Sequence, residues 1–165
     1  MLAKSLFPGA QVLLSDLDLA ALSLAFENSQ IHAVDGMVRG DLLSWCRSSC
    51  VDIIIANPPY VDADDMRGLP AEYRHEPGLA LAGGEDGLDL VRVLLTDAAR
   101  ILRPTGILIL EVGNSFGALD DLSDQLHPIW VELEQGGHGV AVFMAQDLAQ
   151  WAVSEDTTSL VVSAK

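Results

Sequence analysis

The residues best suited to chemistry stand in one short stretch, Asn57-Pro58-Pro59-Tyr60, directly after the aliphatic run 51–56. Neither proline has a backbone N–H to donate, and a residue that precedes proline is pushed toward extended geometry. The Asn57 side-chain oxygen and the Pro58 carbonyl oxygen therefore form a stiff ledge of two hydrogen-bond acceptors.

Two convergent acceptors suit an –NH2 group, which has two hydrogens to donate, and Tyr60 supplies a flat face for a planar amide or base. The nitrogen of such a group is a poor nucleophile because its lone pair is delocalised. Holding both hydrogens and turning the nitrogen toward an electrophile is a positioning strategy. A methyl sulfonium is a natural electrophile, and it needs neither a metal nor a Ser-His pair. The alternative is that the stretch is only a turn that ends a strand.

Hydrophobic periodicity predicts the elements that position this ledge. Short buried strands are expected at 11–16, 31–34, 51–56 and 106–113, helices at 17–28, 85–104 and 114–126, and a hairpin over 128–146. The run 51–56 is aliphatic throughout, which is typical of a strand covered on both faces. Pro104 and Gly106 should end the second helix, and Asn114 or Ser115 should cap the third.

The remaining segments have weaker patterns. Residues 40–49 read as a loop or short helix, and residues 147–165 show no clear pattern and are expected to be loose. The irregular stretch 57–84 is too long for a plain connection, so we expect it to be functional.

Alternating strands and helices that finish in a hairpin predict an α/β fold, with a mostly parallel sheet and an antiparallel edge. Ligands bind such sheets at the carboxyl ends of the strands. Asp16, Asn57 and either Glu111 or Gly113 stand at such ends. The site should therefore lie at that edge of the sheet.

Composition limits the classes of protein. The chain has 165 residues, half of them hydrophobic, and a formal net charge of −15. This charge argues against binding nucleic acid through its phosphates, and it suits either a basic partner or simple solubility. The sequence has no apolar run of about 20 residues, so no membrane span is predicted. Its N-terminus lacks the pattern of a secretory signal. A cytoplasmic location is expected.

The two cysteines, Cys46 and Cys50, are four residues apart, and the four histidines are scattered. A zinc site normally needs four ligands. We therefore expect free thiols in a reducing compartment, with no disulfide and no metal.

The Asn57–Tyr60 stretch is similar to the "NPPY" motif of amino-group methyltransferases that use S-adenosylmethionine. Together with "EYRHEP", "EVGNS" and the "GGHG" hairpin, it resembles the HemK-like protein-(glutamine-N5) methyltransferase family. The resemblance is to the branch that modifies ribosomal protein L-three, and it runs from about Phe7 to about Asp147. It implies a Rossmann-like class I methyltransferase fold, S-adenosylmethionine as cofactor and a basic ribosomal protein as substrate.

The resemblance also implies roles for single residues. Asp16 would bind the cofactor ribose, or cap the following helix, or do both. Asp41 and Leu42 would flank the adenine, although relatives often carry an aromatic residue where this chain has Leu42. The alternative is that these two residues have no role in binding and are ordinary loop and core residues.

In the substrate site, Asn57 and Pro58 would bind the glutamine amide and the Tyr60 ring would line one side of it. Pro59 completes the motif. His75 and Glu76 would belong to a substrate loop, for which a salt-bridged surface loop is the equal alternative.

The family's first strand and its glycine-rich cofactor loop have no counterpart in this sequence, which resembles a chain lacking its N-terminal part. We therefore expect a partial catalytic domain at 1–147 and a C-terminal tail at 148–165, with activity of the chain alone in doubt. Two other functions stay open. One is an adenine-N6 nucleic-acid methyltransferase with the same ledge, and the other is a non-catalytic remnant.

Overall fold

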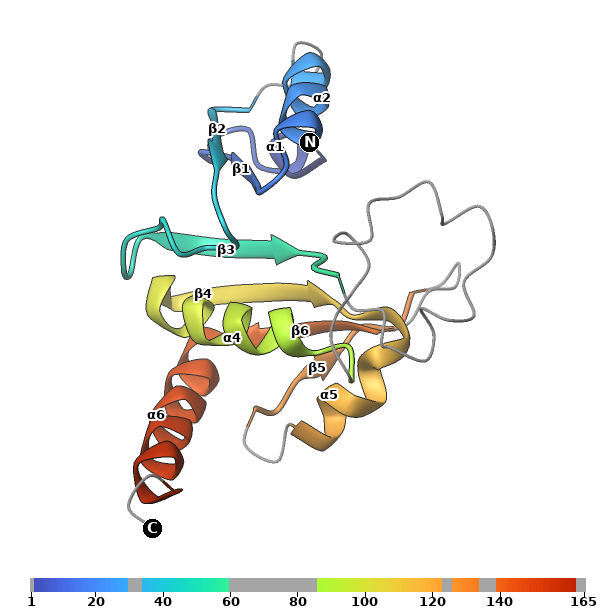
Figure 1. Cartoon of the computed structure of the whole chain (residues 1–165). Helices are drawn as coiled ribbons and strands as arrows, with labels where there is room; N and C mark the ends of the chain where they lie inside the picture. Colours follow the sequence, from blue (N-terminus) through green and yellow to red (C-terminus); the bar gives the residue numbers. More distant parts are fainter. Residues whose placement is uncertain (1, 30–33, 60–85, 123–125, 134–138, 163–165) are drawn as a thin grey trace. The chain divides into compact units, whose positions relative to one another are not determined.

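The computed structural model describes residues 2–29, 34–59, 86–122, 126–133 and 139–162 (Figure 1). The chain divides into two compact units, Met1–Cys46 and Arg47–Lys165, and each is described by itself. None of the helices in the described ranges is long and apolar enough to cross a membrane.

The first unit is built around two parallel strands. Its elements are α1 (Leu2–Leu6), β1 (Leu13–Asp16), α2 (Leu19–Ser29) and β2 (Gly36–Arg39). In the β1–β2 pair, Leu13 is opposite Gly36 and Asp16 is opposite Arg39, so the two strands end together. The Asp35 carboxylate fastens the start of the pair, because it accepts hydrogen bonds from Lys4 Nζ and from Val12 N, each at 2.8 Å.

Two predictions for this unit are confirmed and one is displaced. The strand expected at 11–16 and the helix expected at 17–28 are present as β1 and α2. The expected burial of this strand is wrong, since Leu13 is 54% exposed. Residues 31–33 of the third expected element lie outside the described residues, and the strand that pairs with β1 begins further along, at Gly36. α2 buries none of its residues, and Phe26 is 61% exposed.

The second unit carries a four-stranded sheet of order β3-β4-β6-β5. Its elements are β3 (Val51–Ala56), α4 (Asp89–Ile101), β4 (Leu102–Glu111), the 3-10 turn η3 (Gly113–Ser115), α5 (Phe116–Leu122), β5 (Ile129–Trp130), β6 (Val140–Met144) and α6 (Ala145–Val162). β3 and β4 are parallel, whereas β6 is antiparallel to both β4 and β5. The predicted α/β fold with an antiparallel hairpin is confirmed.

α4 lies alongside β4 (Figure 1), and its buried residues supply the centre of this unit's core. An apolar stripe along α4 and its two flanking residues is buried, with at most 3% exposure for each member: Leu88, Val91, Leu94, Leu95, Ala98, Ile101 and Leu102. Leu108 and Leu110 of β4 are also fully buried. Because alternate residues of a strand point to opposite faces, one face of β4 is packed against this core.

The prediction of a loose, patternless tail is wrong. Residues 145–162 form the helix α6, which packs against α4 and β4. Leu148 is fully buried and Trp151 is 5% exposed. The two side chains are three residues apart and therefore share a helix face. α6 consequently runs across the expected boundary between the catalytic domain (1–147) and the C-terminal tail (148–165).

Two further expectations need correction. α4 covers Asp89–Ile101 and so ends before the predicted stop at Pro104 and Gly106. β4 begins at once and includes Pro104, where a register irregularity against β3 separates the pairs Val51–Leu102 and Ile53–Ile107. A proline is tolerated at such a bulge because no ladder hydrogen bond is needed from it. In the described structure β3 is not covered on both faces either, since Ile53 and Ile55, which share one face of the strand, are 43% and 66% exposed.

Candidate functional site

The ledge residues stand at the carboxyl end of β3, as the sequence predicts. Asn57 follows the strand directly and is exposed, whereas Pro58 is buried and Pro59 is half-buried. A buried proline beside an exposed amide fixes the backbone while leaving the Asn57 side chain available to a ligand. Tyr60, His75 and Glu76 lie outside the described residues.

The neighbouring strand end belongs to β4. Ala56 is opposite Leu110 in the parallel β3–β4 pair, so Asn57 and Glu111 occupy the same edge of the sheet. In open α/β sheets this edge is where ligands bind. The structure thus brings together two of the strand ends that the sequence singled out within this unit.

Two glycine-containing motifs that are far apart in the sequence meet at this edge. Val112 N donates a hydrogen bond of 2.7 Å to Gly139 O. Gly139 has φ +78°, and a Cβ atom placed on it would overlap the carbonyl oxygen of Gly113. Gly139, the one described residue of "GGHG", and the "EVGNS" segment therefore form one junction, in which only glycine permits the backbones to approach so closely.

In the first unit, Asp16 and Asp41 lie near the ends of two adjacent strands. Asp16 is opposite Arg39, and Gly40 N donates to Asp16 O at 3.1 Å. Both carboxylates are exposed. This arrangement presents two acids at the carboxyl edge of a parallel strand pair, where hydroxyl and amino groups of a ligand could donate to them.

The capping role considered for Asp16 falls to a neighbour. Asp18 Oδ1 accepts from Ala20 N at 2.9 Å, in the first turn of α2. Asp16 Oδ1 instead accepts from Asp18 N at 2.8 Å, which closes the turn between β1 and α2. Asp16 is therefore held in place by the turn while its carboxylate stays at the surface.

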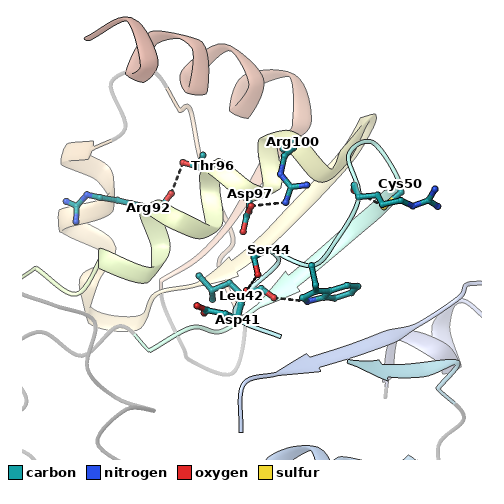
Figure 2. Close-up of polar contacts among 10 residues, drawn as sticks. Asp41, Leu42, Ser44, Cys50, Arg92, Thr96, Asp97 and Arg100 are labelled. Carbon is teal, nitrogen blue, oxygen red and sulfur yellow. Dashed lines mark hydrogen bonds and ion pairs between the residues drawn. The ribbon is translucent and has the colours of Figure 1, made fainter. Parts of the chain in front are cut away.

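The segment after β2 is a tight turn with an unusual backbone. Leu42 has φ +43°, a left-handed conformation that a branched aliphatic residue seldom adopts. Ser44 fastens the turn, because its N and Oγ donate to Asp41 O at 3.1 and 2.8 Å (Figure 2). Asp41 and Leu42 are thus placed by a specific turn.

Trp45 is a residue that the sequence analysis missed. Its indole Nε1 donates to Leu42 O at 3.1 Å and to Ser15 Oγ at 3.0 Å, and so ties the turn to β1. Its ring lies against Gly40, where an added Cβ would overlap ring atoms. The available signal was a large aromatic residue four positions after Asp41, in a loop otherwise short of aromatics.

An ion pair sets the start of α4 in the second unit. Asp86 accepts from Leu88 N at 3.0 Å and from Arg92 Nη1 at 3.1 Å. The hydrogen bond from the Arg92 guanidinium holds the pKa of the Asp86 carboxyl below its ordinary value, and the Leu88 N–H acts in the same direction. Further along the helix, Arg100 pairs with Asp97 at 2.9 Å (Figure 2).

Neither a metal centre nor a disulfide is seen in the described part of the chain. No three metal-ligating side chains gather there, and Cys46 and Cys50 are not joined to each other. The candidate residues therefore fall into two groups. Asp16, Asp41 and Leu42 belong to the first unit, and the Asn57–Pro59 ledge belongs to the second.

Comparison with solved structures identifies the class of fold. The chain aligns with the N-methyltransferase NodS from Bradyrhizobium japonicum WM9 at a TM-score of 0.50 and 13% sequence identity, covering 86% of this chain and 78% of that one. At this identity the likeness concerns the fold alone. The architecture is the Rossmann-like α/β fold that the sequence predicted.

Sequence comparison identifies the relatives. The chain is 39% identical over 158 residues to the ribosomal protein uL3 glutamine methyltransferase of Burkholderia pseudomallei, covering 90% of this chain and 52% of that protein. It is 42% identical over 151 residues to the protein of the same name from Bradyrhizobium diazoefficiens, covering 90% of this chain and 47% of that protein.

The predicted resemblance is thus confirmed: the chain is a relative of the ribosomal protein uL3 glutamine methyltransferases. It spans about half the length of the curated relatives it matches. No family model matches the chain.

Proposed function

We propose that this protein takes part in methylating the side-chain amide nitrogen of a glutamine, with S-adenosylmethionine as the methyl donor. The observation that carries the proposal is the ledge after β3, where an exposed Asn57 amide is followed by a buried Pro58. The similarity to proteins named as glutamine methyltransferases supports the same reading.

The ledge would act by orientation. The Asn57 side-chain oxygen and the Pro58 carbonyl would each accept one N–H of the substrate amide and so fix the plane of its nitrogen. With both hydrogens held, the face of the nitrogen is turned toward the methyl donor. Such positioning supplies much of the rate enhancement in a transfer between two bound groups.

The hydrogen-bond acceptors of the first unit suit the cofactor. S-adenosylmethionine carries two ribose hydroxyls and an adenine amino group, all of which can donate hydrogen bonds to carboxylates. Asp16 would hold the ribose and Asp41 the adenine edge, with Leu42 covering the ring. When bound, the cofactor supplies an electrophilic methyl group on a sulfonium.

A basic protein is the substrate that the charge favours. The chain carries a net charge of −15, and several of its described cations already pair with an Asp: Lys4, Arg92, Arg100 and Arg103. Few positive groups are then available for a phosphate backbone. We propose ribosomal protein L-three as the substrate, and no observation in the described residues favours adenine methylation.

The test is a transfer assay on this protein. Purified protein is incubated with S-adenosylmethionine carrying an isotopically labelled methyl group and with ribosomal protein L-three, and the product is mapped by peptide mass spectrometry. We expect label on the amide nitrogen of a glutamine. Label on another type of residue, or the absence of transfer by folded protein, would contradict the proposal.

A further inference from the structure

A cleft lies beside α5 and β5, at the outer strand of the sheet, and the functional assignment above does not use it. Its volume is about 570 Å³, within the usual range for ligand sites. It is lined by Phe116, Asp120, Trp130, Val131, Glu132, Leu133 and Gly139. None of these described lining residues is basic, so any charge they present is negative.

Two aromatic rings stand at right angles in this cleft. The ring centroids of Phe116 and Trp130 are 6.2 Å apart, with an interplanar angle of 87°. An edge-to-face pair leaves one ring face turned away from its partner. Phe116 is 47% exposed, so the pair has not been sealed into the core.

A carboxylate is fixed beside the indole. Trp130 Nε1 donates to Asp120 Oδ1 at 3.1 Å, which orients the Asp120 carboxylate next to the ring. Glu132, two residues after the end of β5, is exposed, and Leu133 is 48% exposed. An aromatic face, two carboxylates and an exposed aliphatic side chain are thus gathered at one hollow.

These groups together favour a ligand that carries a positive charge at the end of a long apolar side chain. A cation is attracted to the face of an indole ring, and carboxylates form charge-assisted hydrogen bonds with it. The stem of arginine or lysine can lie along apolar side chains while its head reaches the charges. Arginine fits better than lysine, because its planar guanidinium stacks on an aromatic ring and binds carboxylates with two donors at once.

We propose that this cleft binds an arginine side chain of a basic polypeptide, with the guanidinium against Trp130 and between the carboxylates of Asp120 and Glu132. The inference rests on the proposed function only in taking the bearer of the arginine to be a basic protein substrate. Binding at the cleft requires neither methyl transfer nor cofactor, so the two can fail separately.

The experiment is a calorimetric titration of the purified full chain with a synthetic peptide of alternating Arg and Gly. A peptide of the same length, in which Lys replaces Arg, is titrated in parallel. We expect saturable binding of one Arg peptide per chain, at least about fivefold tighter than the Lys peptide. Equal affinities would overturn the assignment to arginine, and no saturable binding would overturn the site.

Matched variants locate the binding. Asp120→Asn removes the charge but keeps an oxygen that can accept from Trp130, and Asp121→Asn makes the same change at the next, exposed position of α5. Combining D120N with Glu132→Gln should weaken the Arg peptide about tenfold or more, whereas D121N should change its affinity less than about twofold. Equal losses in D120N and D121N would show diffuse attraction by the net charge and would overturn the proposal. Unchanged thermal unfolding curves would show that the variants fold.

Discussion

Single residues of the candidate sites are positioned mainly by hydrogen bonds to backbone atoms. Asp16 is held by the N–H of Asp18, and Trp45 donates to Leu42 O. These groups remain at or near the surface, so a ligand can reach them. Removing one such bond should therefore change local placement more than overall stability, because an exposed hydrogen bond contributes only about 1 kcal/mol.

Asp86→Asn tests the pairing at the start of α4. The pKa of Asp86 lies below its ordinary value of 3.8 because its carboxylate accepts hydrogen bonds from Arg92 and Leu88. A lowered pKa stabilises the fold above that ordinary value, and the contribution is lost as the pH falls through the folded-state pKa. D86N should lower the free energy of unfolding at pH 7 by no more than about 1 kcal/mol, since the pair is partly exposed.

The measurement for D86N is urea unfolding at pH 7 and again near pH 3. The difference from the wild-type protein should shrink at the lower pH, where the wild-type carboxyl is increasingly protonated. Asp121→Asn, on the exposed side of α5, serves as a control for the loss of one negative charge. A difference that grew on acidification would contradict the sign of the pKa shift.

Gly139→Ala tests the junction between the two glycine motifs. The φ of +78° and the overlap of an added Cβ with Gly113 O should make this change cost about 1–3 kcal/mol of stability. Gly117→Ala is the matched control, since Gly117 lies in α5 with nothing within 4 Å of an added Cβ. G117A should stabilise the protein by about 0.5–1 kcal/mol. Equal melting temperatures for G139A and G117A would refute the close approach.

Local chemistry was predictable at the residue scale, whereas contacts distant in sequence were not. The place of Asn57, Pro58 and Pro59 after a strand follows from neighbouring residues, because proline acts on the geometry of its own neighbours. The role of Trp45 depends on Ser15, which is 30 positions away in the chain. No local pattern encodes that pairing.

At the scale of elements, α4 has the clearest amphipathic pattern and the best-buried face. Leu95 is fully buried, whereas Val93 on the same helix is 52% exposed. Leu95→Ala should therefore cost about 2–5 kcal/mol, as expected for a large side chain removed from a core. Val93→Ala should change stability by less than about 0.5 kcal/mol. The check is denaturant unfolding of both variants, and comparable losses would show that the stripe has been misassigned.

The elements that the sequence analysis missed have weak or misleading local signals. α6 contains the polar run "SEDTTS", and the buried residues described on it, Ala145, Leu148 and Trp151, all lie in its first two turns. β2 offers only Met37 and Val38 as adjacent apolar residues. β4 begins before Pro104 because a register irregularity absorbs the proline, and such a bulge leaves no distinct pattern in the sequence.

The whole molecule consists of two units, and each carries part of the proposed chemistry. The first presents Asp16 and Asp41 near neighbouring strand ends, and the second presents the Asn57 ledge. The overall negative charge favours a basic partner, and association with one should weaken as salt is added.

The central claim is that Asn57 orients the substrate amide. The most direct measurement is the methyl-transfer rate to ribosomal protein L-three for Asn57→Ala, with S-adenosylmethionine affinity measured by calorimetry on the same samples. Asn28→Ala, at an exposed position of α2, is the matched control. N57A should lose at least about 100-fold in transfer rate while keeping the cofactor affinity within about threefold, because only substrate orientation is removed. N28A should match the wild-type protein. Transfer by N57A at the rate of N28A would contradict the account.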